Sequence, residues 1–151
     1  MIALEFEMMY RLRAVGPMAT TKGSPRGERQ YWQMSDAELE GARIKAKAPY
    51  VGGDWMAVGP DGWGRPNVRV QFETDDGATV LLHYTGLVLA TPAFNAAAEN
   101  GGETTYDEQT MRMTLAFDTG AERYAWLNQS LFIARGHLRA GWVEYEVYRV
   151  A

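Results

Sequence analysis

The sequence predicts an all-β fold, a single antiparallel β-barrel of roughly eight to ten strands that forms one domain over residues 1–151. Three observations favour this class. Apolar and polar residues alternate with a period of two, turn-forming segments interrupt the alternation at short intervals, and no segment carries a long helical pattern. Several expected strands are apolar or aromatic on both faces, which favours a closed barrel with a lumen over a two-sheet sandwich.

The first third of the chain contains three expected strands. Residues 4–12 alternate apolar with mostly charged side chains, the pattern of a strand with one buried and one exposed face. Residues 16–27 are rich in Gly, Pro, Ser and Thr and predict a loop, and residues 29–34 predict a second, shorter strand. Residues 38–46 are interpreted as a third strand, because Gly41 and its small neighbours leave a helix little length to propagate.

Two glycine-containing turns and a hairpin follow. Residues 51–55 and 59–62 predict the turns, because Gly accepts positive φ and Pro presets the first corner of a turn. Residues 67–73 and 78–85 each alternate apolar and polar side chains. The Thr-Asp-Asp-Gly sequence between them predicts a tight hairpin connection.

The last third of the chain is expected to begin with a loop and to end with four strands. Residues 95–107 are polar and predict the longest loop. Residues 110–117 and 123–127 predict a second hairpin around an Asp-Thr-Gly turn. Residues 131–135 and 142–150 predict the final two strands.

Composition argues against several classes of function. The formal net charge is −4, with 15 Lys and Arg against 19 Asp and Glu, so no nucleic-acid partner is expected. No apolar stretch approaches the roughly 18 residues of a membrane helix, and the first residues carry acids where a signal peptide carries bases, so we expect no membrane association and a cytoplasmic location. With no cysteine and two histidines, no metal site and no cofactor are expected.

Nine short segments, taken in their order and spacing, resemble the bacterial family DUF3237, also known as UPF0311. The segments are Gly-Ala-Arg at 41–43, Gly-Gly-Asp-Trp at 52–55, Pro-Asp-Gly at 60–62, Val-Arg at 68–69, Thr-Asp-Asp-Gly-Ala at 74–78, Thr-Gly at 85–86, Phe-Asp-Thr-Gly-Ala at 117–121, Arg-Tyr-Ala-Trp-Leu-Asn at 123–128 and Ser-Leu-Phe at 130–132. The resemblance runs through nearly the whole chain from the Gly27 region onward. It implies a lipocalin-like (calycin) or allene-oxide-cyclase-like barrel, and it leaves the biochemical role undefined.

Three departures from the family pattern fall around the expected pocket. Gly59 stands where relatives tend to have Arg, and Tyr84 stands where they tend to have a small polar residue. Gln109, Thr110 and Met111 replace a stretch that is rich in Tyr in the family. These differences imply a specialised ligand.

Asp54 is the candidate general acid or base. It lies between Gly53 and Trp55, where the backbone can approach a ligand and an aromatic wall can desolvate a carboxylate. Asp61, Asp75, Asp76 and Asp118 occupy evident turn positions instead. The alternative is that Asp54 caps a turn by bonding nearby backbone N–H groups and that Trp55 belongs to the core.

Arg69 and Arg112 are the other candidate catalytic residues. Each falls within an alternating strand, and a guanidinium group inside a barrel would hold an enolate, carboxylate or phenolate. The alternative is an exposed outer face or a structural ion pair. We expect at least one of the two to face the ligand or to form a buried pair.

Six further residues are candidates for binding a substrate. The aromatic and amide side chains among them join flat bodies to polar groups and are suited to orienting a flat molecule, although core packing is an equal alternative for Trp126. His83 is either a proton shuttle or, in the more ordinary interpretation, an exposed strand histidine. The expected substrate-binding residues are Trp55, His83, Tyr84, Tyr124, Trp126 and Asn128.

Two functional hypotheses remain. The first is a cofactor-independent enzyme, an isomerase, cyclase or lyase, that moves protons on a small hydrophobic, polyketide-like or aromatic substrate. The second is a non-catalytic barrel that binds or sequesters such a molecule. The enzyme is favoured because polar strand residues interrupt a lumen that a pure binder would leave apolar. The oligomeric state is open, and a homo-oligomer is compatible with the sequence.

Overall fold

Nine β-strands, two α-helices and one 3-10 helix make up the computed structural model, which describes residues 1–151. The strands are β1 (Leu4–Val15), β2 (Glu28–Gly41), β3 (Lys45–Val58), β4 (Gly64–Arg65), β5 (Asn67–Thr74), β6 (Thr79–Leu89), β7 (Thr110–Asp118), β8 (Phe132–Arg139) and β9 (Trp142–Val150). The helices are α1 (Pro92–Asn100), the 3-10 helix η1 (Glu122–Tyr124) and α2 (Ala125–Asn128). Strands contain 58% of the residues, which confirms the predicted all-β class.

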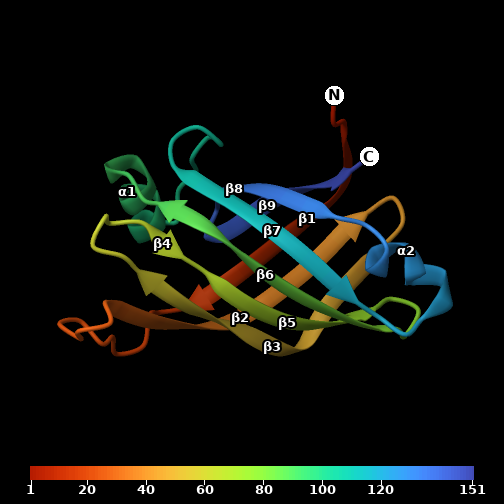
Figure 1. Cartoon of the computed structure of the whole chain (residues 1–151), viewed down its shortest axis with the longest axis horizontal. Helices are drawn as coiled ribbons and strands as arrows, with labels where there is room; N and C mark the ends of the chain where they lie inside the picture. The colour runs from red at the N-terminus through yellow and green to blue at the C-terminus, as the bar shows by residue number, and fades with distance from the viewer.

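The eight long strands close into an antiparallel barrel (Figure 1). Around the barrel they follow the order β1-β2-β3-β5-β6-β7-β8-β9, and β9 pairs with β1 to complete the circle. The short β4 bridges β3 and β6 at one rim. Closure leaves no long strand with a free edge.

Side-chain alternation fills one half of the barrel with apolar groups. In β5 and β7 every second residue is buried, as the sequence pattern predicts. The residues that fill the end near α2 are almost fully inaccessible and include Met8, Phe72, Val80, Leu82 and Val147. This packed half stabilises the barrel and leaves the other half free for a cavity.

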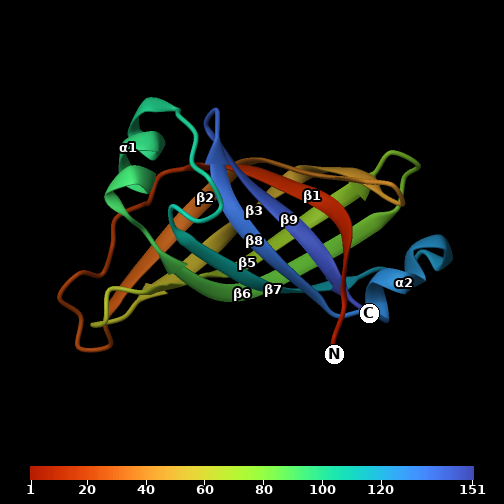
Figure 2. The same cartoon turned by 90° about the horizontal axis from the view of Figure 1, so that it is seen from above.

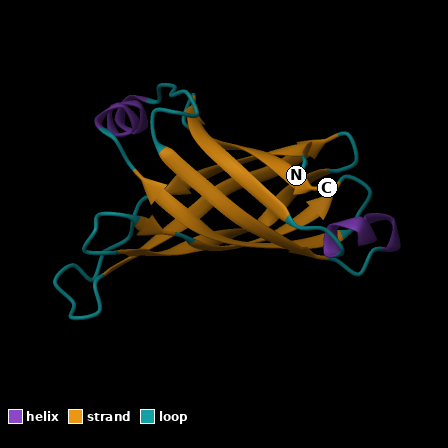
Figure 3. Ribbon diagram, turned by 45° about the horizontal axis from the view of Figure 1, so that its top comes forward, coloured by secondary structure: helices purple, strands orange, loops and turns teal.

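The helices lie at opposite ends of the barrel (Figure 3). α1 lies against one rim, and α2 lies at the other end, close to both chain termini (Figure 2). None of the helices combines the length and the apolar character that a bilayer crossing requires.

Two extra residues in β3 set the faces that its last residues occupy. From Lys47 to Tyr50, and again from Tyr50 to Gly53, β3 advances by three residues while the paired segment of β5 advances by two. Each shift inverts the alternation of side chains, so the two together return Asp54 to the lumen face, opposite Val68. The second shift forms a bulge around Gly52. The expected turn at 51–55 is wrong, because these residues continue β3.

Gly52 and Gly53 are required by close contacts at this bulge. A Cβ atom on Gly52 would lie 1.7 Å from the backbone carbonyl oxygen of Arg69. A Cβ atom on Gly53 would lie 2.5 Å from a ring carbon of Tyr31. The two glycines therefore let β3 approach β5 and a neighbouring aromatic ring.

Two other predicted elements, the strand at 38–46 and the loop at 95–107, differ from the structure. Residues 38–46 do not form one strand, because the chain turns between β2 and β3 and the N–H of Gly41 donates to the carbonyl of Ile44 at 2.8 Å. The expected loop at 95–107 begins inside α1. The hydroxyl of Thr91 accepts from the N–H of Phe94 at the N-terminus of this helix, and Gly101 ends it with φ of 67°.

The expected strand at 123–127 is helical. It forms η1 and α2, although its aromatic residues alternate as in a strand. The side-chain amide of Asn128 accepts from the N–H of Thr119 at 2.9 Å and donates to the carbonyl of Thr119 at 2.8 Å. These bonds fold the segment back over the end of the barrel.

The bulge generates a stability prediction. Gly52→Ala places a Cβ against a backbone oxygen that cannot move without breaking the β3–β5 pairing, so the free energy of unfolding should fall by about 3 kcal/mol. Urea denaturation followed by circular dichroism measures this change. Gly120→Ala is the control, because nothing lies within 4 Å of its added Cβ, and it should stay within about 0.5 kcal/mol of wild type. Equal stabilities for the two variants would contradict the role of Gly52.

Candidate active site

A cavity of about 450 Å³ occupies the half of the barrel near α1. Its size suits one small organic molecule. Of its 21 lining residues 15 are hydrophobic, and they come from the strands and from α1 at the mouth. Met34, Met56, Val88, Phe94 and Met111 form much of this apolar wall.

Asp54 is the one carboxylic acid among the lining residues, which include no Glu, His, Lys or Arg. Its Oδ1 atom accepts from the backbone N–H of Asn67 at 3.0 Å, which fixes the carboxyl group against the start of β5. Burial raises the pKa of Asp54 to about 6, and the Asn67 N–H opposes part of that rise. The second carboxyl oxygen makes no hydrogen bond within the protein and is free to exchange a proton with a ligand.

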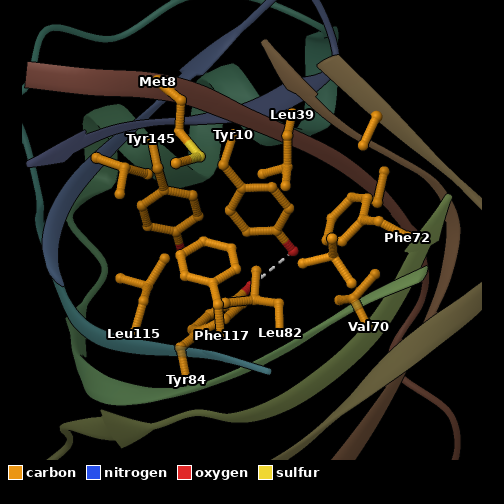
Figure 4. Close-up of a cluster of buried hydrophobic side chains, with 14 of the residues drawn as sticks. Met8, Tyr10, Leu39, Val70, Phe72, Leu82, Tyr84, Leu115, Phe117 and Tyr145 are labelled. Carbon is orange, nitrogen blue, oxygen red and sulfur yellow. Dashed lines mark hydrogen bonds between the residues drawn. The ribbon is translucent and has the colours of Figure 1, made fainter. Parts of the chain in front are cut away.

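Tyr10, Tyr84 and Tyr145 pack against one another in the buried cluster of Figure 4, and Tyr84 and Tyr145 also line the cavity. The hydroxyl oxygens of Tyr10 and Tyr84 lie 3.2 Å apart. The rings of Tyr10 and Tyr145 stack at 5.6 Å with an interplanar angle of 14°, and the Tyr84 ring meets both edge-on. Burial raises the pKa of all three phenols, and the negative charge of Asp54 adds to each rise.

Gln30 and Trp32 complete the polar groups near Asp54. Both lie on β2, and Trp32 pairs directly with Asp54 in the β2–β3 register. The indole N–H of Trp32 donates to Oε1 of Gln30 at 3.0 Å. This bond holds the indole as a flat wall beside the carboxyl group.

Two of the nine predicted site residues line the cavity, Asp54 and Tyr84. The cavity wall also contains Gln30, Trp32 and Tyr145, which the sequence analysis did not select. A signal for these residues exists, because they occupy alternating positions of strands that face the lumen. The two register shifts in β3 have no comparable signature in a single sequence, so spacing alone does not establish the face of each β3 residue.

The structure places neither candidate arginine in the cavity wall. Arg69 and Arg112 both lie on the exposed outer face, and neither forms an ion pair. Arg69 flanks the buried Val68 and Val70, so the alternation of β5 turns it outward. The guanidinium group of Arg112 donates to the carbonyl of Met111 at 3.0 Å.

Two predicted binding residues belong to the outer surface. Trp55 follows the inward-facing Asp54 and points outward, where its side chain is 55% exposed and lies 4.9 Å from the ring of Tyr31. His83 also lies outside, with Nε2 at 2.9 Å from the side-chain oxygen of Asn67. Neither residue contributes to the cavity wall.

Three further predicted residues lie at the α2 end, away from the cavity. The hydroxyl of Tyr124 donates to Asp76 at 2.9 Å, and Trp126 packs 3.6 Å beneath the guanidinium group of Arg43. Asn128 makes the hydrogen bonds to Thr119 described above. These contacts close the filled end of the barrel.

No group of three or more His, Cys, Asp or Glu side chains is arranged to hold a metal ion. His137, the second histidine, contacts the carbonyl of Thr104 at 2.7 Å and the carboxyl of Glu144 at 3.0 Å on the outer side of the barrel. The polar groups available to a ligand in the cavity are therefore a carboxyl group, hydroxyls, amides and an indole.

The fold and its cavity place the chain in the class of closed antiparallel β-barrels with room for a small molecule. The chain belongs to the family described as protein of unknown function DUF3237, which matches residues 3–150 and confirms the resemblance seen in the sequence. A UPF0311 protein of Rhodopseudomonas palustris is 26% identical over 148 residues, which cover 97% of each chain.

Solved structures share the fold. A conserved protein of unknown function from Rhodopseudomonas palustris superimposes with a TM-score of 0.87 at 22% identity, covering 100% of this chain and 99% of that one. A β-barrel-like protein from Acinetobacter baumannii gives a TM-score of 0.81 at 24% identity, with 100% and 97% covered. A structure described as an enzyme from Penicillium herquei gives 0.72 at 18% identity, with 99% and 95% covered.

The burial of Asp54 generates a pH-dependent stability prediction. Its pKa is near 6 in the native state and near 3.8 in an unfolded chain, so the native state binds more protons between these values. The Asp54 contribution to stability therefore falls as pH rises through that window and stays low above it. Asp54→Asn removes this loss and keeps an acceptor for the Asn67 N–H.

The expected result is that the stability of the variant relative to wild type increases with pH. The difference in free energy of unfolding, variant minus wild type, should be more positive at pH 8 than at pH 4 by on the order of 2 kcal/mol. Urea denaturation at both pH values measures it. The same difference at pH 4 and pH 8 would show that Asp54 titrates normally.

Proposed function

We propose that this protein is a cofactor-independent acid–base enzyme, an isomerase, cyclase or lyase, that acts on a small hydrophobic molecule of aromatic or polyketide-like character. Asp54 is the acid or base. The observation that carries the proposal is the placement of this single carboxyl group, backed by hydroxyls, in the wall of an otherwise apolar cavity. A carboxyl group in such a place loses water and gains proton affinity, as catalytic carboxyl groups do.

A pKa near 6 supports this role. A group that titrates close to the working pH both accepts and returns protons with little thermodynamic penalty, which is the property that general acid–base catalysis needs. The apolar wall supports the rest of the function, because it favours substrates with large apolar surface and excludes water from the proton transfer.

The stabilising role first assigned to Arg69 and Arg112 is not part of this proposal, since both lie outside. In this proposal, neutral hydrogen-bond donors in the cavity wall stabilise the substrate instead of the two arginines. The same barrel shape occurs in the protein described as an enzyme from Penicillium herquei, so the fold is compatible with catalysis there.

One observation favours the second candidate function, a barrel that binds or sequesters a ligand without converting it. The wall is mostly hydrophobic, and α1 lies across the mouth, as a storage cavity requires. The two functions differ in one respect. A carrier needs no titrating carboxyl group for its task, whereas the enzyme depends on Asp54.

A general probe of buried carboxylate bases tests the proposal. 5-Nitrobenzisoxazole opens when a base removes its ring C–H proton, the N–O bond breaks and a coloured cyanophenolate forms. The wild type should accelerate this opening, with a rate that rises as Asp54 loses its proton near pH 6. Asp54→Asn should lower kcat/KM by about 10²-fold to 10⁴-fold.

Asp118→Asn is the matched control, because Asp118 is an exposed carboxylate on β7 outside the cavity. It should retain the wild-type rate. Binding of the neutral fluorophore N-phenyl-1-naphthylamine is measured in parallel. If the fluorophore binds tightly and Asp54→Asn does not change the rate of ring opening, the enzyme proposal is wrong and the carrier function is supported.

A further inference from the structure

Tyr145 presents a buried hydroxyl group with no partner in the protein. The residue is 3% exposed and lines the cavity, and its hydroxyl makes no hydrogen bond to another side chain or to the backbone. Unlike Oε1 of Gln109, this hydroxyl oxygen is not fully enclosed by protein atoms. Buried hydroxyl groups are nearly always paired, so this one is available to a ligand.

The hydroxyl of Tyr84 is the second hydrogen-bond donor that is available to a ligand in the cavity. Tyr10 does not line the cavity, and its hydroxyl has Tyr84 as its one partner. If Tyr84 donated to Tyr10, the Tyr10 proton would remain in the core without an acceptor, so Tyr10 is the donor. The hydroxyl of Tyr84 then accepts from Tyr10 and directs its own proton elsewhere, with its donor strength increased by the bond that it receives.

Packing fixes the positions of both free hydroxyl groups. In Figure 4 the stacked rings of Tyr10 and Tyr145 lead toward Tyr84, with the dashed line marking the Tyr10–Tyr84 bond. Gly136 lies beneath Tyr145, where a Cβ atom would come within 2.6 Å of the ring. The rings therefore have little freedom to rotate away, and the donors are oriented before any ligand arrives.

The strand register places Tyr84 at the level of Asp54, and the ring of Tyr145 lies 6.0 Å from that of Tyr84. Asp54 lies opposite Val68, and Val68 lies opposite Tyr84, so the carboxyl group and the hydroxyl belong to one level of the barrel, two strands apart. Two strand spacings amount to roughly 10 Å between backbones. That distance leaves room between the inward-pointing side chains for a flat molecule that touches both.

The charges in the wall select a neutral oxygen. No Lys or Arg lines the cavity, so a carboxylate or phosphate ligand would meet Asp54 without a compensating cation. Burial holds the pKa of Tyr84 and Tyr145 well above its usual range, so both remain protonated donors. A neutral carbonyl oxygen can accept hydrogen bonds from two O–H donors. It also gains negative charge when a proton is removed from the adjacent carbon.

We propose that Tyr84 and Tyr145 hold the carbonyl oxygen of a neutral, flat ketone while Asp54 moves the proton on the adjacent carbon, so that the protein interconverts keto and enol forms and shifts double bonds. This inference rests on the proposed acid–base function and names its substrate class. The arrangement combines an oxyanion-binding pair with one base in a dry site.

The step balances without a further reactant. The free carboxylate oxygen of Asp54 takes the α-proton, the C–H electron pair forms a C=C bond, and the carbonyl π pair moves to oxygen. The two tyrosine hydroxyl groups stabilise the resulting enolate. The proton then returns from Asp54 to the same carbon, or to the far carbon of a conjugated system, which moves the double bond.

Deuterium exchange of 2-tetralone tests the proposal. This neutral aromatic ketone carries acidic protons beside its carbonyl group, and proton NMR in D₂O follows their loss. The wild type should accelerate the exchange, and Asp54→Asn should remove the acceleration. Tyr84→Phe and Tyr145→Phe should each lower kcat by about 10²-fold with a smaller effect on KM, because the lost hydrogen bond is strongest to the enolate.

Tyr124→Phe is the matched control, a buried tyrosine at the filled end whose hydroxyl bonds to Asp76 and whose loss should leave the exchange rate unchanged. Thermal unfolding accompanies each rate, and the two cavity variants are scored separately, so a folding defect in one leaves the other decisive. Wild-type exchange rates in a folded Tyr84→Phe or Tyr145→Phe protein would overturn the donor pair.

The two proposals fail in different ways. If wild type opens 5-nitrobenzisoxazole through Asp54 but does not exchange 2-tetralone, the ketone inference falls and the acid–base function stands. If neither reaction depends on Asp54, both fall. Exchange that depends on Asp54 and on both cavity tyrosines supports both.

Discussion

The site depends on the close approach of β3 to β5 at Gly52. Between Lys47 and Gly53, β3 contains two more residues than the paired segment of β5, and each extra residue inverts the alternation of side chains. The two shifts together leave Asp54 on the same face as the buried Ala46. Gly52 makes the second shift compatible with pairing, because β5 passes too close for any side chain. Either shift without the other would turn Asp54 to solvent and leave the cavity without its carboxyl group.

The barrel divides its interior between stability and function. Apolar side chains pack the half near α2, while the half near α1 contains the cavity and leaves Asp54 only partly solvated. Tyr10, Tyr84 and Tyr145 pack together between the two halves, with Tyr84 and Tyr145 in the cavity wall and the hydroxyl groups of Tyr10 and Tyr84 facing each other. A boundary of phenylalanines would pack as well. The phenols add hydrogen-bond donors there, at a desolvation cost that the packed half offsets.

Much of the fold was predictable from one sequence, and much of the site was not. The alternation in residues 67–73 and 110–117 identifies real strands, because burial on one face leaves a direct mark on residue type. The helical segment after residue 121 has strand-like alternation, and the hydrogen bonds between Asn128 and Thr119, nine residues earlier, override it. Asp54 was found from its flanking residues. The outward turn of Arg69 and the convergence of Tyr10, Tyr84 and Tyr145 depend on register across several strands, which a linear pattern does not record.

The absence of lysine and arginine from the cavity wall affects how a molecule reaches it. A site lined with charge draws in oppositely charged ligands over distances comparable to the Debye length, and its association rate falls as salt is added. This cavity exerts no such attraction on a neutral molecule, so capture is governed by the transfer of apolar surface out of water. Ionic strength should therefore have little influence on uptake, whereas salts that strengthen apolar association, such as sulfate, should favour occupancy.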